Sequence, residues 1–437
     1  MTSTGVNASE NVVYDLFCKV FLPIHVFANT AKKDGNELCD ILIKILDRAI
    51  VVSVKDREFD LENTRSLEWS RWSRKTITKK ASSLTIAARY IRSNFNEIYL
   101  DNVKSKKLPP WVIEGDITKI HKIIIGFNVD SAVAGNKFGN EKTLRLQTIK
   151  DHTDTDLYTV GIVKSENEEV HVFDIEALKL LLQYADTPFE CLDYLDWRAE
   201  RLTERNIIAN GEEDLLTEWM ARRGGYWKPL IDIDEVTRKT GELPIVAYFG
   251  IYEQFRNSCL YERKMAANQE SGFWNALAAY ISDGALINFK DSATWLAAAA
   301  GLLSSEPKSL RAFAWHVLKE KGESNDILEK PIDVIVLSAI DDTYAYFLFV
   351  QPEQMSREHR IKNASYMTGA VARQLNRRCL GIGLLPHSAL TNPVLAYADP
   401  EDDCPIINRD MSEIVITQVD AHKWLIDRFP APVTPSH

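Results

Sequence analysis

The stretch NELCDILIKILDRAIVVSVKD, from Asn36 to Asp56, decides the fold of the N-terminal part of the chain. Two runs rich in Ile, Val and Leu flank a short polar break at residues 47–48, which predicts a β-hairpin. Because side chains alternate along a strand, Ser53 and Lys55 lie on one face of the second strand. The hairpin is therefore predicted to bring an acid near the start of one strand, Asp40, close to an amine at the end of the next, Lys55.

Asp40, a strand, a turn and a second strand that ends in SVK (residues 53–55) resemble the core of the PD-(D/E)XK nuclease superfamily. In that superfamily an aspartate opens one strand, and an acid, any residue and a lysine close the next. The resemblance covers the first quarter of the chain and implies a restriction-endonuclease-like α/β core that hydrolyses phosphodiester bonds with Mg²⁺ or Mn²⁺. It implies that Asp40 is the chief metal ligand, and that Lys55 stabilises charge or orients the attacking water.

The second acid of the family pattern is replaced here by Ser53, whose hydroxyl ligates a hard cation weakly and carries no charge. Glu37 or Glu10 would have to supply the missing carboxylate. Strict alternation sends Glu37 to the face opposite Asp40, so a metal role requires that it lie in the turn before the strand. Glu10 opens a predicted helix, where an acid also favours the positive end of the helix dipole. The expected catalytic residues are Asp40, Lys55, Ser53 and Glu37, and the expected metal ligands are Asp40, Glu37 and Glu10.

A basic segment comes after the hairpin, although the whole chain carries a net charge of -10. Leu61 to Lys107 holds 11 basic and 4 acidic residues, and its apolar spacing predicts a helix from Leu67 to Ile91. These basic residues can bind a phosphate backbone even on an acidic protein. The alternative interpretation is that they only form a solvated helix face. Trp69 and Trp72 either stack on bases or anchor the helix on the sheet. The predicted nucleic-acid-binding residues are Arg71, Arg74, Lys75, Lys79 and Lys80.

The remaining patterns complete a mixed α/β fold. A helix at residues 11–21 with Ser9 as its N-cap, a strand at residues 24–28 and a strand at residues 117–129 give the helix, strand and helix order of the nuclease core. We expect a nuclease-like domain over residues 1–130 and strands followed by a mainly helical region over 131–329. A small C-terminal α/β domain is expected over 330–425, and a disordered tail over 426–437. A Gly-rich loop at residues 134–139 lacks the Lys-Ser/Thr of a P-loop.

Composition places the chain among ordinary soluble proteins, with 45% hydrophobic and 26% charged residues. The chain shows neither a signal peptide nor a long apolar run, which predicts a cytoplasmic protein without membrane contact. The six cysteines show no CxxC spacing, which argues against a disulfide framework and a structural zinc.

Three functions remain open. The leading hypothesis is a Mg²⁺- or Mn²⁺-dependent endonuclease acting most readily on DNA, in bacterial defence or DNA repair by analogy. The second is a nuclease-like fold that no longer cleaves and binds nucleic acid or protein, which Ser53 favours. The third is a helical adaptor, because Ser165 to Asp214 holds 14 acidic and 4 basic residues that suit protein contacts, with a partner protein or a second copy.

Overall fold

The computed structural model describes residues 7–58, 63–109, 116–129, 143–151, 156–165, 168–204, 206–223 and 245–258, with shorter pieces elsewhere up to residue 417. The chain divides into two compact units, Met1–Leu260 and Tyr261–His437. The fold is mixed α/β, as predicted. The predicted Gly-rich loop at 134–139, the helical segment at 271–303 and the tail at 426–437 lie outside the described residues.

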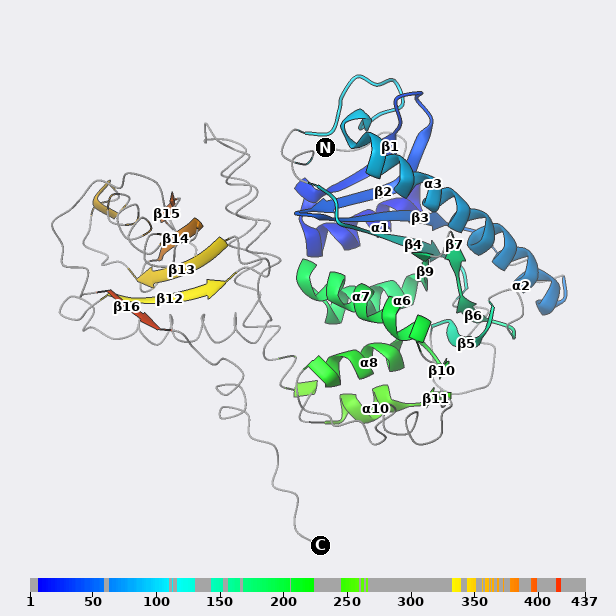
Figure 1. Ribbon diagram of the computed structural model, residues 1–437. Helices are drawn as coiled ribbons and strands as arrows, with labels where there is room; N and C mark the ends of the chain where they lie inside the picture. Colours follow the sequence, from blue (N-terminus) through cyan, green and yellow to red (C-terminus); the bar gives the residue numbers. More distant parts are fainter. Residues whose placement is uncertain are drawn as a thin grey trace, which may run out of the picture. The chain divides into compact units, whose positions relative to one another are not determined.

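The first sheet has five strands in the spatial order β1, β2, β3, β4 and β9 (Figure 1). The first three are antiparallel neighbours, whereas β4 and β9 each run parallel to the preceding strand of the sheet. The parallel β3–β4 pair requires a crossover, which the helices between them provide. The strands are β1 (Val26–Ala31), β2 (Glu37–Ile45), β3 (Arg48–Lys55), β4 (Lys119–Gly126) and β9 (His171–Asp174).

The predicted hairpin at residues 36–56 is therefore present as β2 and β3, with Ile43 opposite Ile50 and Ile41 opposite Val52. The strand predicted at residues 24–28 corresponds to β1. The sheet continues past residue 130, because β9 forms its edge beside β4.

Helix α1 (Ala8–Phe21) packs on β1, β2 and β3. Its N-cap is Asn7 and not the predicted Ser9, because Asn7 and Glu10 form a reciprocal capping box. The Asn7 side chain accepts a hydrogen bond from the Glu10 backbone at 2.8 Å, and the Glu10 carboxylate accepts one from the Asn7 backbone at 3.3 Å. Ser9 is instead a buried residue of the first turn.

The crossover between β3 and β4 is one long helical segment, as the basic stretch predicted. It consists of α2 (Arg65–Ser73), a π-helical turn (Arg74–Thr78) and α3 (Lys79–Asn94). In the π-helical turn the backbone amide of Lys79 donates a hydrogen bond to the backbone carbonyl of Arg74, one residue further back than in an α-helix. Such turns insert an extra residue and rotate the next helical segment, and they are frequent at functional sites.

Helices cover both faces of this sheet, and most of the side chains beneath them are apolar. The face beneath α2 and α3 belongs to a continuous core that includes Leu42, Val51 and Ile124 with Trp72 and Leu84. On the opposite face, α1 contacts β1 to β3, and α6 contacts β4 and β9. Burial on both faces explains the nearly unbroken Ile and Val runs of β3 and β4.

A second sheet completes the N-terminal unit, with strands in the order β11, β10, β5 and β6. Helix α8 contacts β10, α6 and α10, and α6 contacts the first sheet, so these helices join the two sheets (Figure 1). The strands are β5 (Arg145–Asp151), β6 (Thr159–Ile162), β10 (Asn206–Ala209) and β11 (Ile245–Tyr248), with a short hairpin of β7 (Lys164–Ser165) and β8 (Glu168–Glu169) beside them in sequence. The helices are α6 (Ile175–Tyr184), α7 (Pro188–Glu204), α8 (Glu212–Arg223) and α10 (Ile251–Arg256).

The C-terminal unit contains its own sheet, whose strand order is β15, β14, β13, β12 and β16. Among the described residues these five strands pair with one another. Their bounds are β12 (Ile332–Ser338), β13 (Tyr344–Val350), β14 (Arg378–Leu384), β15 (Val394–Ala398) and β16 (Ile414–Thr417). None of the described helices is long and apolar enough to cross a membrane.

Candidate functional site at the end of the first sheet

Asp40 lies near the start of β2, and its side chain is directed across to β3. One carboxylate oxygen, Oδ2, accepts hydrogen bonds from the Ser53 hydroxyl at 3.0 Å and from the Val54 backbone amide at 2.5 Å. Asp40 and Ser53 are both buried, at 5% and 3% exposure. The hydrogen bond from Ser53 therefore orients the Asp40 carboxylate.

Glu37, the first residue of β2, lies beside Asp40 because of a β-bulge. Thr30 of β1 pairs with Cys39, but the next residue, Ala31, pairs with Glu37, so Leu38 is the extra residue on β2. A bulge shifts the alternation of side chains by one, which returns Glu37 to the side of Asp40. Partial burial of its carboxyl group, the charge of Asp40 and a hydrogen bond between the two carboxyl groups raise the pKa of Glu37.

Glu10 reaches the same end of the sheet from α1, although its carboxylate also serves the capping box. Its Oε1 accepts a hydrogen bond from the Asn7 side chain at 2.6 Å. Burial raises the pKa of Glu10, the backbone hydrogen bond from Asn7 lowers it, and the charge of Asp40 raises it further. Glu10 therefore caps the helix, and the charge of Asp40 also acts on its carboxyl group.

Lys55 ends β3 on the same face as Ser53, half-buried. Burial lowers the pKa of its ammonium group, and the adjacent ammonium of Lys80 lowers it further. The charge of Asp40 acts in the opposite direction and raises it. The charges of Asp40 and Lys55 therefore act on one another at this end of the hairpin, and the charge of Lys80 of α3 acts on Lys55 as well.

The two residues after Lys55 fasten the end of β3 to its surroundings. The Asp56 carboxylate accepts hydrogen bonds from the Ser9 hydroxyl of α1 and, at 2.6 Å, from the Asn128 side chain after β4. Arg57 pairs with the buried Glu68 of α2 at 3.4 Å. These contacts hold α1, α2 and β4 around the end of β3. Sequence patterns did not indicate the contacts of Asp56, because its two partners are 47 and 72 residues away along the chain.

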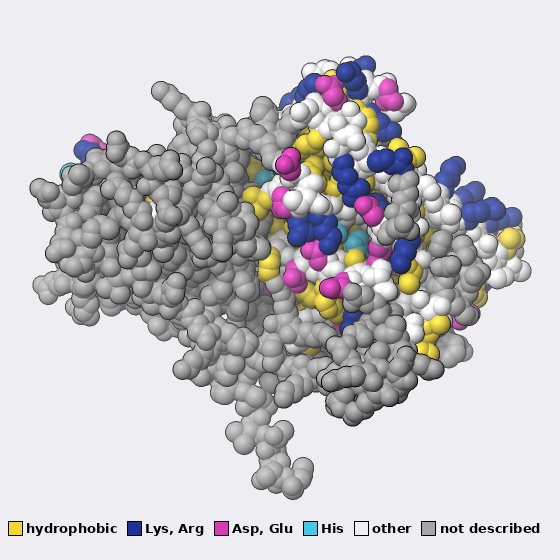
Figure 2. All heavy atoms as spheres, viewed as in Figure 1, with side chains coloured by type: hydrophobic (Ala, Val, Ile, Leu, Met, Phe, Trp, Pro, Cys, Tyr) yellow, Lys and Arg dark blue, Asp and Glu magenta, His cyan; other side chains and the backbone are white. Residues whose placement is uncertain are grey.

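The predicted nucleic-acid-binding residues separate into two groups. Arg74, Lys75 and Lys79 are exposed, whereas Lys80 is half-buried beside Lys55 and Arg71 pairs with Glu68 at 2.9 Å. Figure 2 shows Lys and Arg side chains gathered at the end of the molecule where Figure 1 draws α2.

Trp69 and Trp72 belong to the core, which was the favoured interpretation of these residues. They are 5% and 1% exposed, and their rings stack at 5.1 Å between centroids. A Cβ added to Gly126, at the end of β4, would lie 2.4 Å from the ring of Trp72, so the glycine makes room for the ring. Bases cannot stack on rings that are covered in this way, and the pair instead anchors α2 on the sheet.

The donor chemistry of this site suits a hard divalent cation, since it offers the carboxyl oxygens of Glu37 and Asp40 and the hydroxyl of Ser53. Within the part of the chain that the structure describes, no three His, Cys, Asp or Glu side chains converge on one point as a ligand set. The two carboxyl groups lie beside two ammonium groups, so the site can bind a cation and an anion next to each other.

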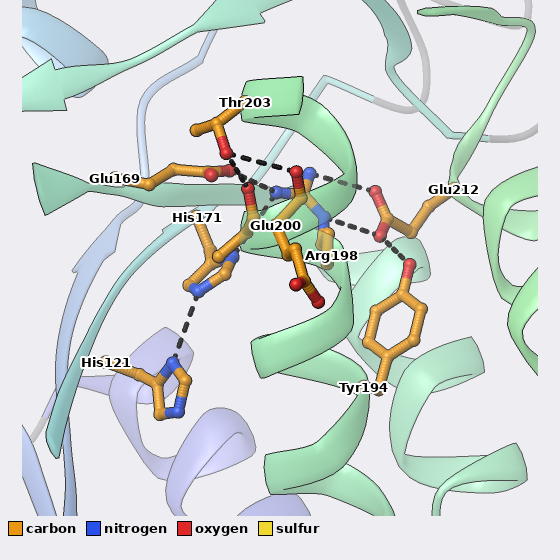
Figure 3. Close-up of polar contacts among 9 residues, drawn as sticks. His121, Glu169, His171, Tyr194, Arg198, Glu200, Thr203 and Glu212 are labelled. Atoms are coloured by element: carbon orange, nitrogen blue, oxygen red, sulfur yellow. Dashed lines mark hydrogen bonds and ion pairs between the residues drawn. The ribbon is translucent and has the colours of Figure 1, made fainter. Parts of the chain in front are cut away.

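A second polar cluster is buried between the first sheet and helices α7 and α8 (Figure 3). The guanidinium of Arg198 bonds both oxygens of Glu212, at 2.8 and 3.1 Å, and lies 3.5 Å from Glu169. Its Nη1 is 3.4 Å from His171, whose other ring nitrogen is 3.4 Å from His121. Arg198 is 2% exposed and also stacks over Phe173 at 4.7 Å.

The electrostatics of this cluster are those of a structural core. Burial raises the pKa of Glu169 to about 8, against the effect of Arg198. Burial lowers the pKa of His171 well below its usual value, and Arg198 and His121 lower it further, so the ring is neutral. His121 also pairs with Asp196 at 3.3 Å. These side chains come from β4, β8, β9, α7 and α8, and their burial fits a role in joining the sheet to the helices.

Comparison with known proteins gives no relative for this chain: no family model, no curated protein and no solved structure matches it.

Proposed function

We propose that this protein is a metal-dependent nuclease that hydrolyses phosphodiester bonds, most readily in DNA, at the end of its first sheet. The observation that supports the proposal is the meeting of the Glu37–Asp40 carboxyl pair with the Lys55 ammonium across one hairpin. The helix, three antiparallel strands, crossover helix and parallel strand have the order that the PD-(D/E)XK resemblance implies.

In this proposal Asp40 and Glu37 hold Mg²⁺ or Mn²⁺, with Ser53 close by. A bound cation would polarise the scissile phosphate and lower the pKa of a coordinated water. The Ser53 hydroxyl and the Val54 amide donate to one oxygen of Asp40, which fixes the carboxylate beside Glu37. The bulge at Leu38 supplies, through Glu37, the charge that Ser53 lacks.

Lys55 contributes a positive charge whose position is fixed by the end of β3. Its lowered pKa, caused first by burial, makes its ammonium a better proton donor than an exposed lysine. Such a group can neutralise charge on a phosphate oxygen or on the departing oxygen of the sugar.

The alternative is a nuclease-like module that binds nucleic acid and does not cleave it. The observation that favours it is the Ser53–Asp40 hydrogen bond, because a carboxylate oxygen already bonded to two protein donors is less available to a cation.

The test is an incubation of the full chain with supercoiled plasmid and single-stranded DNA in Mg²⁺, Mn²⁺ or EDTA. We expect nicking or cleavage in Mg²⁺ or Mn²⁺ and none in EDTA. The cleavage rate should fall by a factor on the order of 100 or more in Asp40→Asn and in Lys55→Met. The matched controls are Asp15→Asn on the exposed side of α1 and Lys33→Met, whose side chain is 72% exposed. Absence of cutting in every metal, with DNA binding retained, would favour the binding module; equal loss in the controls would contradict the assigned residues.

A further inference from the structure

Lys80 differs from the other basic residues of its helix in where it lies. It belongs to the first turn of α3, which packs against β2, β3 and β4, the strands that carry the site. Lys79, Lys75 and Arg74 are exposed to solvent, whereas Lys80 is half-buried. A lysine that is withdrawn from water has lost part of its hydration, which requires compensation by a nearby group.

The neighbours of Lys80 are the residues of the candidate site. Its ammonium group interacts with the ammonium of Lys55 and with the Glu37 carboxyl group. Two like charges side by side destabilise one another, and the effect is larger where water is partly excluded. Glu37 offsets this repulsion in part, since its charge reaches both lysines.

The π-helical turn explains how this lysine reaches the site. The turn spans Arg74–Thr78 and directly precedes Lys79, so its additional residue rotates α3 relative to α2. Thr76 and Ile77 within the turn are fully buried against the sheet. In the next turn Lys80 is half-buried, where its charge acts on Lys55 and Glu37, whereas Lys79 stays in solvent.

We propose that Lys80 and Lys55 together bind one phosphate group of the nucleic acid, at the position where the Asp40 and Glu37 carboxyl pair acts. This inference rests on the proposed function and names the contact that holds the substrate there. A phosphodiester between the two ammonium groups removes their mutual repulsion and forms charge-assisted hydrogen bonds to both. Lys80 then binds substrate, while the exposed basic residues of α2 and the π-helical turn contribute only the general attraction of a basic surface.

The experiment compares Lys80→Met with Lys79→Met, which makes the same change of charge one residue away on the exposed face. Binding of a fluorescent DNA oligonucleotide by the full chain is measured by anisotropy in EDTA, where no cleavage occurs. We expect Lys80→Met to weaken binding roughly tenfold or more and Lys79→Met by less than about threefold. Lys80→Arg should restore most of the affinity.

Equal effects of the Lys79 and Lys80 substitutions on binding would overturn the inference. If Lys80→Met weakens binding but the wild type does not cleave DNA, only the nuclease proposal is overturned. If the wild type cleaves DNA and Lys80→Met binds it normally, only this inference is overturned.

Discussion

Removal of the Arg198 guanidinium should open the packing between the first sheet and helices α7 and α8. In Arg198→Met the side chain keeps much of its apolar length, but Glu212 loses its cation in a buried setting. The guanidinium makes two hydrogen bonds to Glu212, at 2.8 and 3.1 Å, and is 2% exposed. Breaking a buried pair from one side costs about 3–5 kcal/mol, since an uncompensated charge remains.

The assay is hydrogen exchange on the full chain, which reports the opening free energy of each segment separately. Peptides that cover β9 and α8 should lose about 3 kcal/mol or more of protection in Arg198→Met. The matched control is Arg92→Met, which removes an exposed ion pair whose Arg92 and Glu168 side chains are 2.7 Å apart. This change should lower the opening free energy by no more than about 1 kcal/mol.

The double variant Arg198→Met with Glu212→Gln supplies the stricter test. Because the second change removes the charge that the first leaves unpaired, the double variant should be less destabilised than the sum of the single variants by about 2 kcal/mol. A loss of protection in Arg198→Met that equals the loss in Arg92→Met, or strict additivity in the double variant, would refute the reasoning.

Two further predictions concern the end of the first sheet. Gly126→Ala should destabilise the protein by about 1–3 kcal/mol and shift tryptophan fluorescence, because the new Cβ meets the buried ring of Trp72; an unchanged denaturation midpoint would contradict this. Mg²⁺ affinity, measured by calorimetry between about pH 5 and pH 8, should rise with pH. The reason is that protons compete for Glu37, whose pKa is raised, and in Glu37→Gln the rise should be smaller; an equal rise in that variant would show that Glu37 is no ligand.

Patterns within one element were readable from the sequence, and contacts between distant elements were not. The apolar runs of β2, β3 and β4 predicted strands because burial on both faces selects Ile and Val. The helix after β3 was predicted from its apolar spacing. Alternation placed Ser53 and Lys55 on one face of β3, and the hairpin pattern brought Asp40 near them; in the structure Ser53 donates a hydrogen bond to Asp40.

The local exceptions needed the structure. Strict alternation placed Glu37 on the wrong face for a ligand, because the bulge at Leu38 is set by pairing with β1 and leaves no mark in β2 itself. Ser9 satisfied the usual rule for an N-cap, yet Asn7 holds that position, since Ser9 bonds Asp56, 47 residues away.

The buried cluster around Arg198 also escaped the sequence analysis. Its members are spread from β4 to α8, and the acidic stretch that contains Glu212 resembled a solvated surface. Glu212, Glu213 and Asp214 are in fact buried at the start of α8. A signal was present in Tyr194 and Arg198, one helical turn apart, but their shared partner lies beyond the end of α7.

The two sheets of the N-terminal unit alternate along the chain, and this order has a consequence for synthesis on the ribosome. After β4 the chain forms β5 and β6 of the second sheet, returns to add β9 to the first, and then leaves again for β10 and β11. The first sheet therefore lacks its edge strand until residue 174 has emerged, and the second lacks two strands until residue 248 has emerged. Neither sheet can be finished as a separate early product, so a nascent chain that stalls between them exposes the open edge of β4. Both sheets are thus complete only when residue 248 has emerged, and a fragment cut near residue 130 would carry an unpaired strand edge that favours aggregation.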